Sequence, residues 1–177
     1  SCVRPCRYFE GTPSPHRHPE DLDVIVYREN TEDIYMGIEW EEKDPICRKV
    51  IEYLNNEIIP ISEEIKNKRI PQSSGIGIKP VSKKGSQRHI RKAIQHALKL
   101  KGNKRHVTLV HKGNIMKFTE GAFRDWGYEL AIGEFRKECI TERESWVLEN
   151  IEKNPGISIE KNAQIIEPGF ESLTMEK

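Results

Sequence analysis

Short β-branched runs alternate with amphipathic segments along this chain, and this alternation limits the possible folds more than any other feature. Leu22–Arg28 (LDVIVYR) and Val107–His111 (VTLVH) have the composition of strands that are buried on both faces of a sheet. A helix is predicted between them, from the cap residue Ser82 to a stop at Gly102, and a second one over Lys117–Glu138. The order strand, helix, strand, helix favours an α/β architecture.

A small insertion interrupts this alternation. Ile34–Trp40 is predicted to be a strand, and Asp44, which is followed by a proline, is a good cap for a helix. Gly75–Pro80 (GIGIKP) is a further extended segment that suits a hairpin-like partner of Ile34–Trp40. The predicted organisation is the start of an α/β domain at residues 1–34, an inserted α+β subdomain at 35–80, the return of the α/β domain at 81–140, and a polar loop with one short helix at 141–177.

Charge is strongly segregated, although the 177 residues carry a formal net charge of only +1. Residues 65–119 contain fifteen Lys and Arg and no Asp or Glu. Such a block indicates an anionic partner, and three kinds are compatible with it: a phosphorylated cofactor, a polycarboxylate or nucleic acid. The alternative is a solvated basic face that the acidic flanking segments neutralise.

Membrane, secretion and metal-binding signals are all missing from the sequence. No run of about 18 apolar residues occurs and no secretory apolar segment opens the chain, so we expect a cytoplasmic protein. The four cysteines lack the density of a disulfide scaffold and are expected to be reduced. No set of histidines or carboxylates has convincing metal-ligand spacing. Because the first residue is Ser1 and not Met, we expect a piece of a longer protein.

Arg4, Arg7 and Arg28 are the candidate anion-binding residues. A planar guanidinium holds a carboxylate with two hydrogen bonds, so a substrate with several carboxylates needs several arginines at fixed positions. Arg28 ends a predicted core strand, and strand ends are where α/β sheets bind ligands. The alternative for each arginine is an ion pair with a nearby acid such as Glu29, Glu32 or Asp33.

Lys112 and Tyr35 are the candidate acid–base residues. Lys112 follows the second predicted core strand and precedes a Gly-Asn turn, so we expect its ammonium group to be partly desolvated, as a proton donor or acceptor requires. Tyr35 opens the insertion, and a tyrosine beside a lysine is a recognised acid–base pair. A tyrosine at a strand start is also a common packing residue, so spacing alone leaves both functions open.

The strings at these positions resemble one family. They are RPCRYFEGTPSP (Arg4–Pro15), VYRENTEDIYMGIEW (Val26–Trp40), GIGIKP (Gly75–Pro80) and VTLVHKGNIMKFTEGAFRDWGYELA (Val107–Ala131). Together they resemble the prokaryotic NADP-dependent isocitrate dehydrogenases, within the decarboxylating dehydrogenases that also include isopropylmalate dehydrogenase. The resemblance extends from Arg4 to Glu138, and RYFEGTPSP points to the isocitrate branch.

The resemblance implies a function for each candidate residue. Arg4 and Arg28 match arginines that bind the substrate carboxylates. Tyr35 matches the catalytic tyrosine, and Lys112 matches a catalytic lysine that the neighbouring subunit supplies. Asn114 matches an asparagine near the nicotinamide of NADP. Arg7 lies in the motif but outside the primary substrate ligands, so it keeps the ion-pair interpretation.

The implied activity is oxidative decarboxylation of isocitrate to 2-oxoglutarate and CO2 with NADPH formation, a step of the tricarboxylic acid cycle. Hydride transfer precedes metal-assisted loss of CO2, and Tyr35 with Lys112 then protonates the enolate. Mg²⁺ or Mn²⁺ is implied, with ligands outside this chain. Residues 35–80 correspond to the family's clasp, which interlocks two subunits of a homodimer.

Other interpretations stay open at this point. Family members are more than twice as long, so the chain alone is expected to be inactive and to lack the residues that choose between NADP and NAD. A related 2-hydroxy-acid dehydrogenase, a purely structural dimerisation module and a nucleic-acid-binding domain built on residues 65–119 are the alternatives. The predicted helix after Ser82 has no aromatic stacking residue beside its charges, which argues against nucleic acid. The resemblance implies isocitrate as the partner, and we expect neither nucleic acid nor a membrane.

Overall fold

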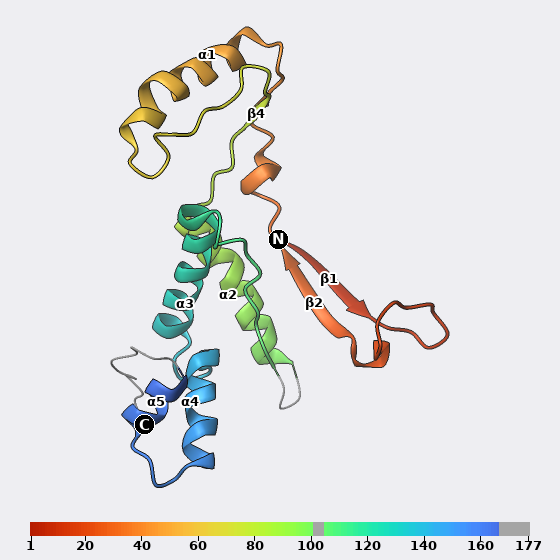
Figure 1. Cartoon of the computed structure of the whole chain (residues 1–177). Helices are drawn as coiled ribbons and strands as arrows, with labels where there is room; N and C mark the ends of the chain where they lie inside the picture. The colour runs from red at the N-terminus through yellow and green to blue at the C-terminus, as the bar shows by residue number, and fades with distance from the viewer. Residues whose placement is uncertain (101–104, 167–177) are drawn as a thin grey trace. The chain divides into compact units, whose positions relative to one another are not determined.

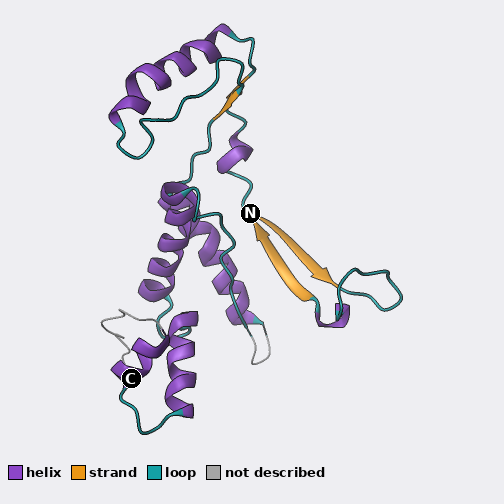
Figure 2. Ribbon diagram, viewed as in Figure 1, coloured by secondary structure: helices purple, strands orange, loops and turns teal. Residues whose placement is uncertain are grey.

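The chain mixes helices and strands in two compact units, Ser1–Gly85 and Ser86–Lys177 (Figure 1). The structure is a computed structural model that describes residues 1–100 and 105–166, with the backbone alone for 163–166. The strands are β1 (Cys2–Arg7), β2 (Asp23–Arg28), β3 (Glu39–Trp40) and β4 (Ile76–Gly77). The α-helices are α1 (Pro45–Tyr53), α2 (Lys83–Lys99), α3 (Ala122–Glu134), α4 (Glu142–Lys153) and α5 (Ile159–Ile166) (Figure 2). No helix in the described part of the chain is long and apolar enough to cross a bilayer.

The first unit opens with an antiparallel hairpin of β1 and β2, from Cys2 opposite Arg28 to Arg7 opposite Asp23. The predicted strand at Leu22–Arg28 is confirmed as β2, whereas β1 is not part of the sequence prediction. Pro5 lies within β1 and has no N–H to donate, which an edge strand tolerates.

The prediction that this strand is buried on both faces is wrong. Val24 and Val26 are exposed, and only Ile25 and Tyr27 of the apolar residues in β2 are half-buried. Within residues 1–100 and 105–166, β2 pairs with β1 alone, so both strands of this sheet are edge strands. A continuous β-branched run therefore marks the strand but not the number of its neighbours.

The insertion has the predicted helix and the predicted pairing of its two ends. β3 and β4 are antiparallel, with Trp40 opposite Ile76. The Asp44 carboxylate accepts a hydrogen bond from the Ile46 N–H at 2.7 Å and so caps α1.

The predicted strand at Ile34–Trp40 is wrong over its first half. Asp33–Met36 is a single 3₁₀ turn, and Gly37 ends it in the left-handed region with φ 64°. The Asp33 carboxylate accepts a hydrogen bond from the adjacent Ile34 N–H at 2.6 Å. Short aspartate side chains commonly make such local bonds to the backbone, and they compete with strand pairing.

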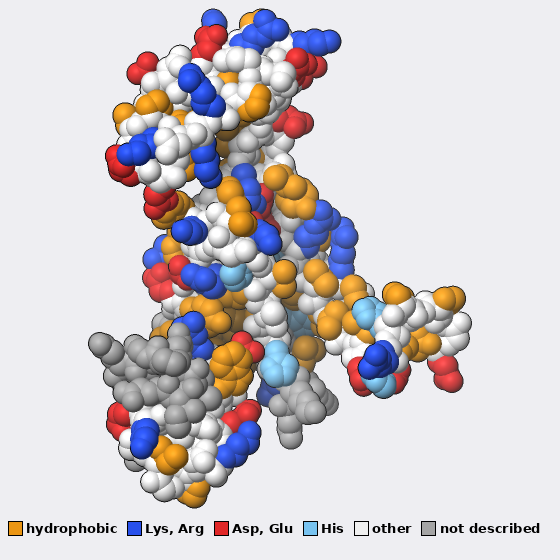
Figure 3. Space-filling model, viewed as in Figure 1, with side chains coloured by type: hydrophobic (Ala, Val, Ile, Leu, Met, Phe, Trp, Pro, Cys, Tyr) orange, Lys and Arg blue, Asp and Glu red, His pale blue; other side chains and the backbone are white. Residues whose placement is uncertain are grey.

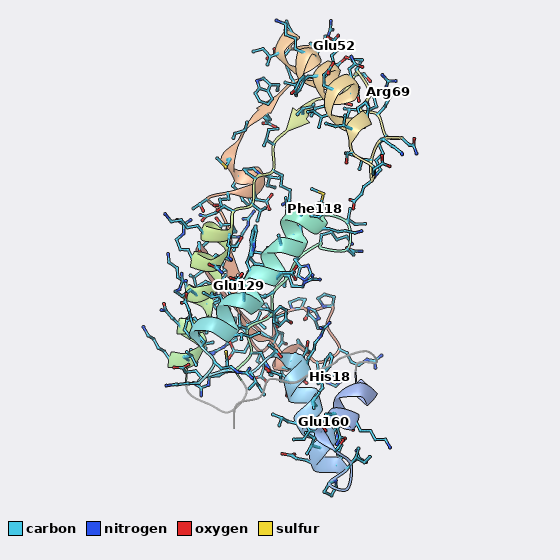
Figure 4. The ribbon with its side chains drawn as sticks, turned by 90° about the vertical axis from the view of Figure 1, so that its left-hand side faces the viewer. His18, Glu52, Arg69, Phe118, Glu129 and Glu160 are labelled. Atoms are coloured by element: carbon cyan, nitrogen blue, oxygen red, sulfur yellow. The ribbon has the colours of Figure 1, made fainter. Side chains whose placement is uncertain are left out.

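The core of the insertion joins α1 to the segment that returns along it. Cys47 and Ile51 are fully buried. The Asn55 amide donates to the Ile70 carbonyl and accepts from the Ile70 N–H, both at 2.9 Å. Figure 4 shows Glu52 on α1 and Arg69 on the returning segment. Side chains of both charges and exposed apolar side chains share the outer surface of this part (Figure 3).

The core of the second unit is formed mainly by α2 and α3. Its buried residues are Ile90, Ile94, Leu130 and Phe135. Gly127 of α3 allows a close approach here, because a Cβ at this position would lie 2.5 Å from Leu109 Cδ1. The predicted cap of α2 is confirmed within the first unit, since the Gly85 N–H donates to Ser82 Oγ at 3.0 Å. The predicted stop at Gly102 lies outside the described residues.

The predicted core strand at Val107–His111 is not a strand in this structure. The segment has no ladder partner in the described part of the chain, and Val107 and Val110 are exposed. Leu109 alone packs against the core of the second unit. The Gly113-Asn114 turn that follows is confirmed, and the predicted helix after it comprises a π-helical turn at Lys117–Gly121 and α3.

The segment predicted as a polar loop with one short helix forms two helices up to residue 166. Thr141 begins α4 with a capping box, in which its side chain accepts from the Glu144 N–H and the Glu144 carboxylate accepts from the Thr141 N–H. Asn162 of α5 is fully buried and accepts a 2.7 Å hydrogen bond from Asn150 of α4. The predicted break at Pro168-Gly169 lies outside the described residues.

Candidate active site

The β1–β2 ladder places Arg4 and Arg28 on the same face of the hairpin. Arg4 is opposite Val26, and Arg28 follows Val26 by two residues. Residues opposite each other share a face in an antiparallel pair, and side chains alternate along a strand. The two arginines are therefore diagonal neighbours, at a separation typically about 7–8 Å between backbones. Neither side chain has a carboxylate partner in the structure as described, and both residues are exposed.

Arg7 lies on the opposite face and has a different role. It is directly opposite Asp23 in the ladder, and its guanidinium donates to the Asp23 carboxylate at 2.8 Å. This hydrogen bond raises the pKa of Arg7 above its ordinary value. The ion-pair interpretation of Arg7 is confirmed, although the acid differs from those predicted. The neighbouring acids Glu29 and Asp33 make other contacts, described next.

Tyr35 and Arg28 are in direct contact. The Arg28 guanidinium donates a hydrogen bond to the Tyr35 hydroxyl and lies over the tyrosine ring, 4.7 Å from its centroid. Tyr35 is 44% exposed, so a large part of this residue is open to a bound molecule. Arg28 has five N–H donors, and the bond to Tyr35 leaves others for an anion.

The turn between Arg28 and Tyr35 is held by its own acidic side chains. The Glu29 carboxylate accepts from the N–H groups of Asn30 at 2.9 Å and Thr31 at 2.5 Å, and from the Thr31 hydroxyl. Glu29 therefore closes the turn through these three hydrogen bonds. Because side chains in a locally closed turn lose less freedom on binding, this turn pre-organises Arg28 and Tyr35.

Lys112 and Asn114 lie in the second unit, on the segment before α3. The Lys112 N–H donates to the Glu120 carboxylate at 2.9 Å, and its carbonyl accepts from the N–H groups of Ile115 and Met116, both at 3.1 Å. Both Lys112 and Asn114 are exposed. The prediction that Lys112 is partly desolvated is therefore wrong for this chain by itself, because the expected buried strand before it does not form.

The basic block is partly neutralised within the second unit. Arg91 of α2 makes two hydrogen bonds to the Glu134 carboxylate of α3, at 2.7 and 2.5 Å. These bonds lower the pKa of Glu134 below its ordinary value. Arg88, Lys92 and Lys99 of α2 are exposed. The helix is thus both an internal partner of α3 and a solvated basic face, as the alternative interpretation of the charge pattern requires.

Metal-binding groups do not converge in the described residues. No cluster of three or more His, Cys, Asp or Glu side chains that could hold an ion is found in residues 1–100 and 105–166. These residues therefore do not fit a metal ion by themselves, and the roles assigned to them involve no metal coordination. Asn114 offers both an amide donor and an amide acceptor, which fits the carboxamide of a nicotinamide.

Comparison with known proteins identifies the class of protein to which this chain belongs. The family model described as isocitrate/isopropylmalate dehydrogenase matches residues 1–148. The chain belongs to the isocitrate/isopropylmalate dehydrogenase family.

Individual relatives have names that are more specific than the name of the family. Proteins named isocitrate dehydrogenase [NADP] from Nostoc sp. and Synechocystis sp. are 67% and 64% identical to the chain over all 177 residues. The chain spans 37% of the length of each of these two relatives. A protein of the same name from Staphylococcus aureus is 53% identical over 141 residues, which is 80% of this chain and 32% of that protein.

A solved structure adds a likeness in fold. Isocitrate dehydrogenase from Methylococcus capsulatus is 34% identical, with a TM-score of 0.50, and the match covers 75% of this chain and 30% of that structure. The fold predicted from the sequence, a mixed α/β unit of this family, is thereby confirmed at the level of the family.

Two long-range pairs at the turn were missed by the sequence prediction, although Glu32, Asp33 and Ser82 were named in it for other roles. Glu32 accepts hydrogen bonds from the Ser82 N–H and hydroxyl at 2.9 and 2.5 Å, and Asp33 pairs with Lys79. Glu32 and Asp33 are about fifty residues away from these partners in sequence, and no local pattern indicates such pairs. The local signal that could have pointed to them is the pair of adjacent acids shortly before Tyr35.

Proposed function

We propose that this chain is the central part of an NADP-dependent isocitrate dehydrogenase. The longer protein would oxidise and decarboxylate isocitrate to 2-oxoglutarate and CO2 and would form NADPH. The names of the relatives that are 53–67% identical support this function. The single observation that carries it is the contact of Arg28 with the Tyr35 hydroxyl, on the hairpin face that also holds Arg4.

The two arginines account for recognition of the substrate. Isocitrate carries three carboxylates, and two diagonal guanidinium groups without an internal acid on their face can each bind one of them. Arg28 at the same time holds the Tyr35 hydroxyl beside the bound carboxylate. In this arrangement Tyr35 delivers its phenolic proton to the enolate carbon that loss of CO2 leaves behind, and Lys112 of a neighbouring subunit restores the proton.

A homodimer completes this site in the proposal. Residues 35–80 would form the clasp between subunits, and Lys112 would enter the site of the neighbouring subunit. Val110 and Phe118 lie two residues before and six residues after Lys112 in the sequence and are 87% and 77% exposed, and Figure 4 labels Phe118 in the π-helical turn that precedes α3. Large exposed apolar side chains around a functional residue are typical of a segment that another chain covers.

The bound cofactor and metal belong to the longer protein. NADP would supply the hydride acceptor, and Asn114 would hold the nicotinamide carboxamide through its amide group. Mg²⁺ or Mn²⁺ would have its ligands outside this chain. We place the enzyme in the cytoplasm and expect neither nucleic acid nor a membrane as its partner.

The test is a substrate and cofactor panel on the longer protein that contains this chain. NADPH formation is measured with isocitrate and Mg²⁺, beside isopropylmalate and beside NAD. Rapid NADP-linked oxidation of isocitrate alone is the expected result. A preference for isopropylmalate or NAD would assign the chain to another branch of the family. A folded protein that is silent on every pair would contradict the function, and salt-dependent binding of nucleic acid to the basic block would then be measured.

A further inference from the structure

The two ends of the insertion meet at the turn that carries Tyr35. The Asp33 N–H donates to the Pro80 carbonyl at 2.9 Å, and the Ile78 N–H donates to the Ile38 carbonyl at 2.9 Å. The Ile78–Ile38 bond continues the register of the β3–β4 ladder by one residue, whereas the Asp33–Pro80 bond lies outside that register. The segment that leaves the insertion is therefore bonded directly to the residues around Tyr35.

Asp33 occupies a backbone conformation that needs support from its surroundings. Its φ is 62°, and it is the one non-glycine residue with positive φ in the described part of the chain. Left-handed backbone is unfavourable for a residue with a Cβ and persists where neighbouring groups hold it. The Asp33 carboxylate bonds to the Ile34 N–H at 2.6 Å and to the ammonium group of Lys79. Both side chains of this ion pair are three-quarters buried, at 25% exposed each.

We propose that Lys79 is a positioning residue for Tyr35. By pairing with Asp33, Lys79 holds the strained turn two residues before Tyr35 and so keeps the tyrosine hydroxyl at Arg28. The base of the insertion thereby sets the geometry of the acid–base residue, and this role of Lys79 requires no contact with substrate or cofactor. This inference rests on the proposed function, because it assigns a purpose to the position of Tyr35.

A second anchor acts on the same turn. The Glu32 carboxylate binds the N–H and the hydroxyl of Ser82, at the start of α2. Gly85 leaves the space for this carboxylate, because a Cβ at Gly85 would lie 2.1 Å from Glu32 Oε1. Two neighbouring acids therefore attach one turn to two points on residues 79–82. The Gly85→Ala substitution displaces the Glu32 anchor without changing any charged residue.

The experiment measures steady-state kinetics of NADP-linked isocitrate oxidation with the full-length protein. Lys79→Met is expected to lower kcat on the order of 10- to 100-fold, since a displacement of about 1 Å at a catalytic group can have an effect of this size. The KM for isocitrate should stay close to that of the wild type, because Arg4 and Arg28 are unchanged. Lys79→Arg, which keeps the charge, should recover most of the turnover.

Two controls separate positioning from folding. Lys153→Met removes a surface lysine that is 4.0 Å from Glu149 in α4, and it should leave both constants unchanged. Asp33→Asn should lower kcat like Lys79→Met, and the double variant should lose little more than either single variant, because the two residues act as one unit. Circular dichroism and urea unfolding measure the folded fraction of each variant.

Several results would overturn the proposal. One is a normal kcat for Lys79→Met when the wild type oxidises isocitrate. This result would contradict the role of Lys79 but not the proposed function. Another is a loss that the smaller folded fraction explains completely, or a loss that falls on KM instead of kcat. Additive losses in the double variant would also contradict it. A wild-type protein without activity on isocitrate would overturn both the proposed function and this inference.

Discussion

Alanine at Gly127 should strain the core of the second unit, whereas alanine at Gly133 in the same helix should not. A Cβ at Gly127 would lie 2.5 Å from Leu109 Cδ1 and 2.8 Å from Ile90 Cδ1. Ile90 is only 2% exposed, so the space for relief is small. A Cβ at Gly133 would meet no atom within 4 Å. The two variants are therefore a matched pair for the packing of α3.

The expected magnitudes follow from two effects of opposite sign. Overpacking a well-filled core destabilises a protein by about 1–3 kcal/mol. Replacing glycine by alanine inside a helix stabilises it by up to about 1 kcal/mol. The second effect is common to both variants, so Gly127→Ala should be less stable than Gly133→Ala by about 1–3 kcal/mol. Gly133→Ala itself should equal or exceed the wild type in stability.

Amide hydrogen exchange in peptides from α3 measures this difference locally. Exchange should be faster in Gly127→Ala than in the wild type, and equal or slower in Gly133→Ala. Equal exchange in the two variants would refute the reasoning, because it would mean that α3 does not approach Leu109 and Ile90 as closely as the structure shows.

Further predictions concern one ion pair and the arginine face. A hydrogen bond from Arg136 lowers the pKa of Glu144 below its ordinary value, so its stabilising effect is complete above the pKa of the unfolded chain and is lost as the pH falls through the folded pKa. The urea midpoint of the wild type should therefore fall on acidification within the acidic range, and Glu144→Gln should remove that part of the pH dependence. A midpoint in Glu144→Gln with the wild-type pH dependence would contradict this. Arg28→Ala should raise the KM for isocitrate strongly, whereas Arg7→Ala on the opposite face should leave it almost unchanged; similar effects of the two would disprove the assignment of faces.

Local signals in the sequence were sufficient for the helix starts. Asp44 and Ser82 cap α1 and α2 as predicted, because a cap depends only on residues within one turn. The start of α4 had an equally local signal, the Thr141-x-x-Glu144 capping box, which the prediction did not use. Its polar composition favoured a loop instead.

Strands were harder to predict because their partners are distant in sequence. The β-branched run at Val107–His111 has no partner strand in the residues described, so strand composition alone was misleading. β1 was missed because Pro5 is unfavourable in a strand with two neighbours, although an edge strand accepts it. A strand forms only where a second segment supplies the hydrogen bonds, and the composition of one segment does not identify that partner.

In the candidate site, too, local motifs were recognised from the sequence and long-range contacts were not. Arg4, Arg28 and Tyr35 were recognised from motifs, and the structure adds that Arg28 touches Tyr35. The Asp33–Lys79 pair spans 46 residues and became visible only in the folded chain. Lys112 was expected to be desolvated, and its exposure in this chain is consistent with the proposal that another subunit covers it.

The most direct test of the central claim, a site shared between two subunits, mixes two inactive variants of the full-length protein. Tyr35→Phe and Lys112→Met should each dimerise normally and lose most of their turnover. Refolded or co-expressed together, they form mixed dimers in which one site combines an intact Tyr35 with an intact Lys112, so NADP-linked isocitrate oxidation should return. Mixed dimers that form but stay as inactive as the parents would contradict the claim that the two residues meet across the subunit interface.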